Sequence, residues 1–258
     1  MINITSWTEL AAIRSALNGD YVLTANLSSS DADYASAGGS DWTPIGTTGA
    51  EFTGTFDGDG FTISDLVIST SSDYNGLFGR TAGATIENVG LIDVDVTAGS
   101  YTGGLVGYNG GSSSIVNSYA TGGVSGTSEV GGLVGFNGGS FGGGASIDNS
   151  YATGSVSGTS NVGGLIGNYE RGTQTNNGWY TGAGGGATHA IGSTSGSVTN
   201  ETATLSDFYD KTYNVYDANS PVWDFTTPIW YEHASDYPSF IPPPVPVETV
   251  SPMMMFFW

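Results

Sequence analysis

The chain has 258 residues, no cysteine, and 42 glycines that lack the every-third-residue spacing of collagen. Four basic residues against 24 acidic ones give a formal net charge of −20, which repels phosphate backbones and argues against nucleic acid as a partner. Without cysteine, the fold depends on neither disulfides nor thiol chemistry.

The N-terminal residues predict a short capping helix. Ser6-Trp7-Thr8-Glu9 has the pattern of a capping box, and Leu10, Ile13 and Leu17 follow at helical spacing until Asn18-Gly19 ends the pattern. The end of a stack of strands exposes apolar surface and unpaired backbone. We therefore expect this helix to cover the first coil of such a stack.

Short strands are expected after the helix. Tyr21-Val22-Leu23, Phe52 to Phe56 and Phe61 to Ile68 have the composition of strands in irregular early coils. Asp57-Gly58-Asp59-Gly60 predicts a tight turn. The same four residues invite a calcium interpretation, but they lack the bidentate glutamate of an EF-hand, so the turn is favoured.

A repeat follows in the middle of the chain. Gly76-Leu77-Phe78-Gly79 returns in three longer copies of the form GGL(V/I)G, and the marker glycines are separated by 28, 28 and 32 residues. Within each repeat the apolar stretches are short, alternating and bounded by Gly, Ser, Asn and Thr, which indicates strands and turns. The markers are Gly76, Gly104, Gly132 and Gly164.

Each glycine block is followed by an I-x-N block, which twice extends to NSYATG. One repeat has too little apolar surface to fold alone, whereas stacked repeats bury a continuous core with like residues about 4.8 Å apart. The predicted internal leucine ladder is Leu77, Leu105, Leu133 and Leu165, beside an isoleucine ladder of Ile86, Ile115 and Ile147. The predicted amide ladder at a corner is Asn88, Asn117, Asn149 and Asn177, and the predicted aromatic column is Tyr119, Tyr151 and Trp179.

The C-terminal part differs in composition. Residues 183–240 become rich in aromatic side chains and predict a closing module for the solenoid. Residues 241–258 form a proline-rich arm of polyproline II character. Either the arm folds back on its own solenoid, or its apolar end inserts into a partner protein or a neighbouring copy. The partner-anchoring residues in the second case are Met253, Met254, Met255, Phe256, Phe257 and Trp258.

The repeat blocks resemble those of GLUG-motif proteins. GLFG, GGLVG and GGLIG, each with a following I-x-N block, carry the resemblance, together with Trp42 to Gly46, Phe52 to Gly60 and Trp223-Asp224-Phe225. The resemblance covers roughly residues 1–240 and implies an all-β fold, a right-handed parallel β-helix. It also implies a module of surface adhesins or of surface-attached proteases, in which the GLUG part is a stalk or an adhesive element.

Two aspartates and two histidines are the candidates for catalysis or metal binding in this chain. Asp93 and Asp95 alternate with apolar residues, which would place both carboxylates on one solvent-facing side, as in glycan-cleaving β-helix enzymes. The same alternation is what a half-buried strand requires for solubility, so no catalytic residue is assigned. His189 and His233 are isolated from other ligand-type residues, so neither a metal nor a cofactor is expected.

The domain prediction has four parts. Residues 1–70 form the N-terminal cap and first coils, 71–182 the GLUG-repeat solenoid, 183–240 the closing module and 241–258 the arm. No run approaches the 18 apolar residues of a membrane span. Met1 to Thr5 lack the basic segment and apolar run of a signal peptide, so either a signal was removed or export uses another route, such as assembly into a virion.

The expected function is therefore a non-enzymatic structural or adhesive module, displayed on a cell surface or on a virion as a decoration or tail appendage. Expected partners are a protein or a neighbouring copy through the arm, in which case the chain is a homo-oligomer, and a cell-surface glycan or receptor. The alternative from another class is a polysaccharide-cleaving β-helix enzyme, a lyase or a hydrolase.

Overall fold

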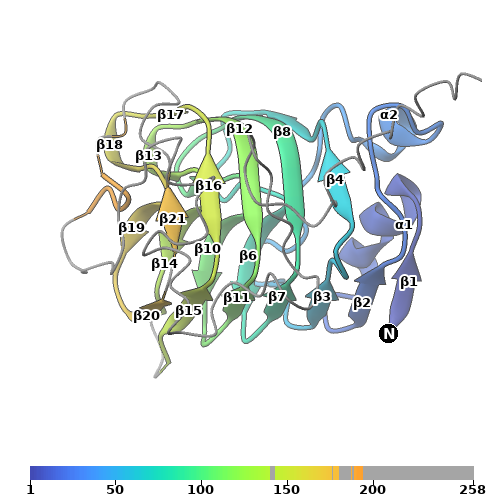
Figure 1. Cartoon of the computed structure of the whole chain (residues 1–258), viewed down its shortest axis with the longest axis horizontal. Coiled ribbons are helices and arrows are strands. Elements are labelled where there is room, and N and C mark those ends of the chain that lie inside the picture. The colour runs from blue at the N-terminus through green and yellow to red at the C-terminus, as the bar shows by residue number, and fades with distance from the viewer. Residues whose placement is uncertain (140–142, 176, 180–186, 188, 194–258) are drawn as a thin grey trace, which may run out of the picture.

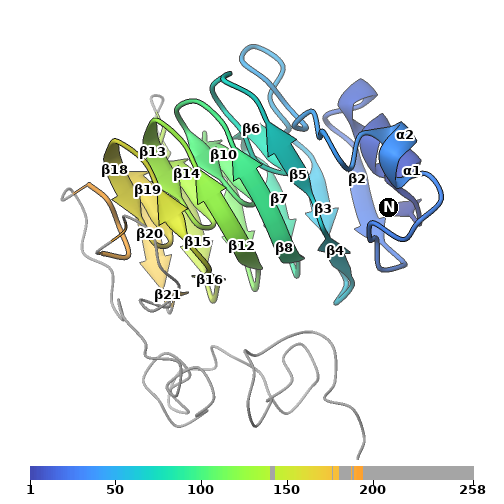
Figure 2. The same cartoon turned by 90° about the horizontal axis from the view of Figure 1, so that it is seen from above.

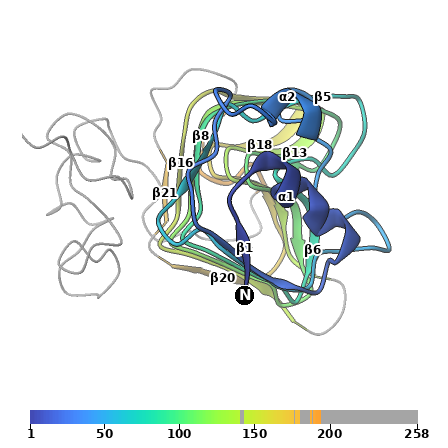
Figure 3. The ribbon, with the colours of Figure 1, turned by 90° about the vertical axis from the view of Figure 1, so that its right-hand side faces the viewer.

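A computed structural model describes residues 1–139, 143–175, 177–179, 187 and 189–193. Its strands pair in parallel and stack along the long axis of the molecule, with the helices at the N-terminal end (Figures 1 and 2). Viewed along that axis, the chain winds in coils around a closed interior (Figure 3). The predicted parallel β-solenoid fold is confirmed.

Four parallel sheets form the sides of the solenoid. The first contains β1 (Ile2–Ile4), β2 (Asp20–Leu23), β3 (Thr55–Asp57), β7 (Thr85–Glu87), β11 (Ser114–Val116), β15 (Ala145–Asp148) and β20 (Gly172–Thr175). The second contains β6 (Phe78–Ala82), β10 (Val106–Gly110), β14 (Val134–Asn137) and β19 (Ile166–Tyr169). The third contains β4 (Thr62–Ser64), β5 (Val67–Ser69), β8 (Gly90–Thr97), β12 (Tyr119–Ser125), β16 (Tyr151–Thr153), β17 (Val156–Ser157) and β21 (Gly178–Trp179). The fourth contains β9 (Thr102–Gly103), β13 (Ser128–Gly131) and β18 (Ser160–Gly163).

Successive repeats lie in register, so equivalent residues meet across neighbouring coils. Val106 pairs with Val134, and Ile115 pairs with both Ile86 and Ile147. One repeat therefore forms one coil, because parallel strands of neighbouring coils pair like residues only when each coil contains one repeat. The additional residues of the 32-residue repeat fall between β14 and β15 in the chain.

Apolar side chains from all four sheets fill the interior. The four repeated leucines lie on successive coils and are at most 1% exposed, and the backbone N–H of Leu133 donates to the carbonyl of Leu165 at 3.0 Å. Gly104 shows why the preceding glycine pair is needed, since a Cβ there would lie 2.7 Å from the carbonyl oxygen of Gly132. Gly103 and Gly104 do not have positive φ values. The glycine pair is therefore required because the backbones of neighbouring coils approach closely there, and not because of an unusual backbone conformation.

One corner of the coil is built by the Asn-Ser pair of the repeat. Asn88, Asn117 and Asn149 adopt positive φ values of 55°, 49° and 51°, a conformation that asparagine tolerates. The amide of Asn117 donates to Asn88 at 3.2 Å, and that of Asn149 donates to Asn117 at 3.3 Å. The hydroxyl of Ser150 accepts the backbone N–H of Ser118 at 3.1 Å.

Asn177 lies in a different row from the one predicted. Tyr151 pairs with Gly178, so Asn177 is opposite Ser150 and its side-chain oxygen accepts the Ser150 N–H at 2.9 Å. Trp179 likewise pairs with Ala152 and is buried in the core, so it is not part of the aromatic column. The repeat is too degenerate at this point to fix its register from the sequence, and a slip of one residue reverses which side chains face inward.

A second amide row, which the sequence analysis missed, lies inside the solenoid. Thr81, Asn109 and Asn137 are at most 1% exposed. The hydroxyl of Thr81 donates to Asn109 at 2.9 Å, and the amide of Asn109 donates to Asn137 at 2.8 Å. Asn137 in turn donates to the carbonyl of Ala145 at 3.0 Å. These bonds satisfy amide groups that would otherwise be costly to bury.

The predicted capping helix is present as α1 (Trp7–Ala12), continued by the 3-10 turn η1 (Ile13–Ser15). Ser6 accepts the backbone N–H of Glu9, whose carboxylate accepts the N–H of Thr5 at 2.7 Å. A second short helix, α2 (Tyr34–Ala37), lies beside α1 (Figure 3). Trp7 is fully buried and meets Trp42 edge to face at 5.8 Å, so the cap is packed onto the first coils.

Candidate functional site

Aromatic side chains gather on the outside of the solenoid, beginning at the corner that precedes β6 and β10. Tyr74, Tyr101, Glu129 and Asn161 occupy equivalent places on successive coils, with positive φ values of 65°, 59°, 52° and 50°. The left-handed conformation costs a residue such as tyrosine about 1–2 kcal/mol. Tyr74 and Tyr101 stack with their ring centres 4.7 Å apart, a contact worth about 0.5–1.5 kcal/mol, which offsets only part of that cost.

The neighbouring strand face extends this group. Arg80 on β6, Tyr108 on β10 and Phe136 on β14 pair in register and are half-buried. The rings of Tyr108 and Phe136 stack at 4.7 Å, and the guanidinium of Arg80 lies 4.2 Å from the centre of the Tyr108 ring. Tyr101 meets both rings edge to face. We call Tyr74, Tyr101, Tyr108, Phe136 and Arg80 the aromatic corner.

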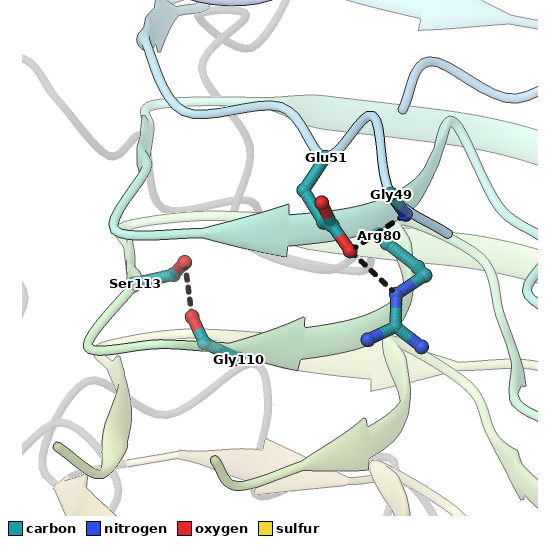
Figure 4. A network of polar contacts seen from close by, with 5 residues as sticks. All are labelled: Gly49, Glu51, Arg80, Gly110 and Ser113. Atoms are coloured by element: carbon teal, nitrogen blue, oxygen red, sulfur yellow. Dashed lines mark hydrogen bonds and ion pairs between the residues drawn. The ribbon is translucent and has the colours of Figure 1, made fainter. Parts of the chain in front are cut away.

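The charge of Arg80 is balanced locally. Its Nε lies 3.4 Å from Glu51, which also accepts the backbone N–H of Gly49 at 3.1 Å (Figure 4). The hydrogen bond from Gly49 is the main reason that the pKa of Glu51 is lowered, with Arg80 contributing. Burial, followed by the nearby Glu129, raises the pKa of Tyr101, so the phenol of Tyr101 is neutral at physiological pH.

A polar pocket adjoins the aromatic corner at Tyr74. It lies between two loops, residues 41–47 and 69–75, and has a cavity volume of about 420 Å³. Pro44 and Tyr74 contribute apolar surface, Asp41 and Asp73 contribute carboxylates, and Thr47, Ser69, Thr70 and Ser72 contribute hydroxyls. We call this cavity the loop pocket. Neither it nor the aromatic corner was predicted from the sequence, although Tyr101 and Tyr108 flank a glycine block of the repeat.

The acidic residues weighed earlier lie elsewhere. Asp93 and Asp95 are both exposed on β8 and alternate with the buried Val94 and Val96, and Asp93, with φ 53°, lies at an irregularity in the pairing with β12. The predicted turn at Asp57 is present, because Asp57 accepts the N–H of Asp59 at 2.8 Å. Among the residues that the structure describes, no three metal-ligand side chains are grouped closely enough to hold a metal ion.

Several predicted features lie outside the described residues. These are His233, most of the closing module at 183–240 and the whole arm at 241–258, including the anchoring set Met253 to Trp258. Where the structure describes the chain, it contains no helix long and apolar enough to cross a membrane.

Comparison with known proteins agrees with the coil geometry. Residues 98–125 and 126–157 match the model described as the GLUG motif, and each stretch covers one coil. These coils are GLUG repeats. The β-solenoid therefore contains GLUG repeats.

Two individual proteins are similar to this GLUG-repeat chain. Halomucin of Haloquadratum walsbyi is 41% identical over 116 residues, which is 44% of this chain and 1% of halomucin. The chain thus spans only a small piece of that relative. The crystal structure of a protein from Bacteroides ovatus, described as a putative immunoglobulin A1 protease, matches with a TM-score of 0.59 at 20% identity, over 92% of this chain and 91% of that one. This second likeness concerns the fold alone.

Proposed function

We propose that this chain is a non-enzymatic structural and adhesive module of an extracellular surface, and that the aromatic corner is a contact surface. The observation that carries the proposal is the position of four rings from three coils on the outer side of the solenoid. Two of them, Tyr74 and Tyr101, occupy a backbone conformation that is unfavourable for tyrosine. Rigid aromatic side chains supply large contact area at low entropic cost. Similarity to a stretch of halomucin supports a surface location.

Attachment through the aromatic corner is tested by substituting its outer members. Tyr101→Asn keeps a residue suited to positive φ, and Phe136→Thr keeps a residue suited to a strand. We expect the double variant to lose most of its binding to cells or particles bearing the native surface. Thr97→Ala, exposed on β8 in another sheet, is the matched control and should bind normally. Equal binding by all three proteins contradicts the adhesive role.

The finer part of the proposal concerns display and anchoring. The module is held on a cell surface or on a virion by the arm, residues 241–258, whose end from Met253 to Trp258 inserts into a partner or a neighbouring copy. Such an apolar end is a typical anchor, since aromatic and methionine side chains dominate tight interfaces.

Deleting residues 241–258 tests the arm. We expect the shortened protein to lose attachment to purified virions or to cell envelopes while its far-ultraviolet circular dichroism is unchanged. Light scattering on both proteins shows whether the partner is another copy. If the shortened protein attaches as well as the whole chain and has the same oligomeric state, the arm is not an anchor, and the adhesive role is unaffected.

An assay of polysaccharide cleavage tests whether the chain is an enzyme, with Asp93 and Asp95 as the candidate catalytic residues. We expect no depolymerisation of neutral or acidic polysaccharides by the whole chain, measured by reducing-end release and by ultraviolet absorbance of unsaturated products. Turnover that disappears in the variant Asp93→Asn with Asp95→Asn would show that the chain is an enzyme.

A further inference from the structure

The loop pocket has the size of a small-molecule site. Its volume of about 420 Å³ falls within the range of about 300–1,000 Å³ that such sites occupy. Its lining combines apolar surface of Pro44 and Tyr74 with carboxylates and hydroxyls, whereas Trp42 is almost wholly buried beside it. A ligand that fits must therefore present both an apolar face and several hydrogen-bonding groups.

The walls of the loop pocket are held in place by the fold. Trp42 is 2% exposed, its indole N–H donates to the carbonyl of Leu77 at 3.1 Å, and its backbone N–H donates to that of Val67 at 2.8 Å. On the other loop, the amide of the buried Asn75 donates to the carbonyl of Ser72 at 2.6 Å. A ligand entering a preformed pocket loses less free energy to ordering the protein than one entering a flexible pocket.

The second loop is also tied to the next coil. Asp73 accepts the backbone N–H of Ser100 at 2.8 Å, and the N–H of Tyr74 donates to the carbonyl of Ser100 at 2.9 Å. Both faces of the Tyr74 ring are in contact, since Tyr101 stacks on it and the guanidinium of Arg80 lies 4.6 Å from its centre. Tyr74 is therefore held in a fixed position where it lines the loop pocket.

Charge selects among possible ligands. Asp41 and Asp73 line the loop pocket, and its lining includes no lysine or arginine. Arg14 and Arg80 contact the lining residues Thr43 and Tyr74, and Arg80 is paired with Glu51. An anionic ligand would be repelled by both carboxylates, whereas a neutral polyol has hydroxyl groups that donate to them. Its C–H groups also pack against Pro44 and against the part of Tyr74 that lines the loop pocket.

We propose that the loop pocket binds one neutral pyranose residue of a surface glycan. This inference rests on the proposed adhesive function and names the ligand class. The pocket and the aromatic corner share Tyr74, so a glycan chain held by one residue in the loop pocket continues over the aromatic corner.

The test is a titration of the whole chain with methyl glucopyranoside, methyl galactopyranoside and methyl mannopyranoside, followed by saturation-transfer difference NMR. We expect saturable, millimolar binding of at least one of them. Methyl glucuronoside, an anion of similar shape, should bind at least about tenfold more weakly because of the two carboxylates. Absence of saturable binding by all three neutral sugars overturns the inference, as does tighter binding of the glucuronoside.

Variants place the ligand in the loop pocket. Tyr74→Asn tolerates positive φ and should weaken binding about 3- to 10-fold, and Asp41→Asn, at an exposed position, should weaken it similarly. Glu129→Asn is the matched control, because it changes the equivalent corner two coils away and should leave binding unchanged. Full affinity in both pocket variants refutes the assignment. If attachment still depends on Tyr101 and Phe136, the adhesive proposal stands while the sugar site falls.

Discussion

Replacing Asn137 by alanine should be among the most destabilising single changes in the coils. Asn137 is fully buried, accepts from Asn109 at 2.8 Å and donates to the carbonyl of Ala145 at 3.0 Å. The variant leaves the buried amide of Asn109 and the carbonyl of Ala145 without this partner, and it also removes the longer bond to the carbonyl of Arg171 at 3.4 Å. Each unsatisfied buried group costs about 1–3 kcal/mol, so we expect a loss of about 2–6 kcal/mol.

Asn117→Gly is the control for that variant. Asn117 belongs to the outer amide ladder, where water replaces lost hydrogen bonds, and glycine adopts its φ of 49° without strain. We expect a loss of about 0.5–1.5 kcal/mol there. Urea unfolding followed by circular dichroism measures both values, and an unchanged slope shows that the transition is comparable. A loss for Asn137→Ala no larger than that for Asn117→Gly refutes the reasoning.

Three further predictions concern charge. Burial, and then the facing Asp57, raise the folded-state pKa of Glu87. The ionised carboxylate of Glu87 therefore destabilises the folded state at pH values above its unfolded pKa. Glu87→Gln should raise the melting temperature at pH 7 and leave it unchanged below about pH 4. The hydrogen bond from Thr5 lowers the pKa of Glu9. The ionised carboxylate of Glu9 therefore stabilises the folded state above about pH 4, and this stabilisation is lost as the pH falls through the folded-state pKa. Glu9→Gln should lower the melting temperature at pH 7 but not at pH 2. Sodium chloride at about 1 M should stabilise the chain, because screening reduces the self-repulsion of a net charge of −20, and a melting temperature that falls with salt would contradict this.

The aromatic corner could be predicted from the sequence only in part. Tyr101 and Tyr108 flank GGLVG, and Phe136 repeats the place of Tyr108 on the next coil, so a signal for one column was present. The sequence does not indicate that Tyr74 and Tyr101 lie at a corner with positive φ, because tyrosine is an unfavourable residue for that conformation. The loop pocket was equally hidden, since its two loops are separated in the chain by β3, β4 and β5.

The sequence by itself determined the solenoid, the length of its coil and the interior rows of leucine and isoleucine. Repetition places identical residues above one another, and short apolar stretches between glycines form strands that bury a face only when stacked. Only the tertiary structure decided the register at Asn177, the inward position of Trp179 and the meeting of Tyr74 with Tyr101 and Arg80. Those features depend on how each corner turns and on which strand residue faces outward, and a shift of one residue there exchanges the inner and outer faces.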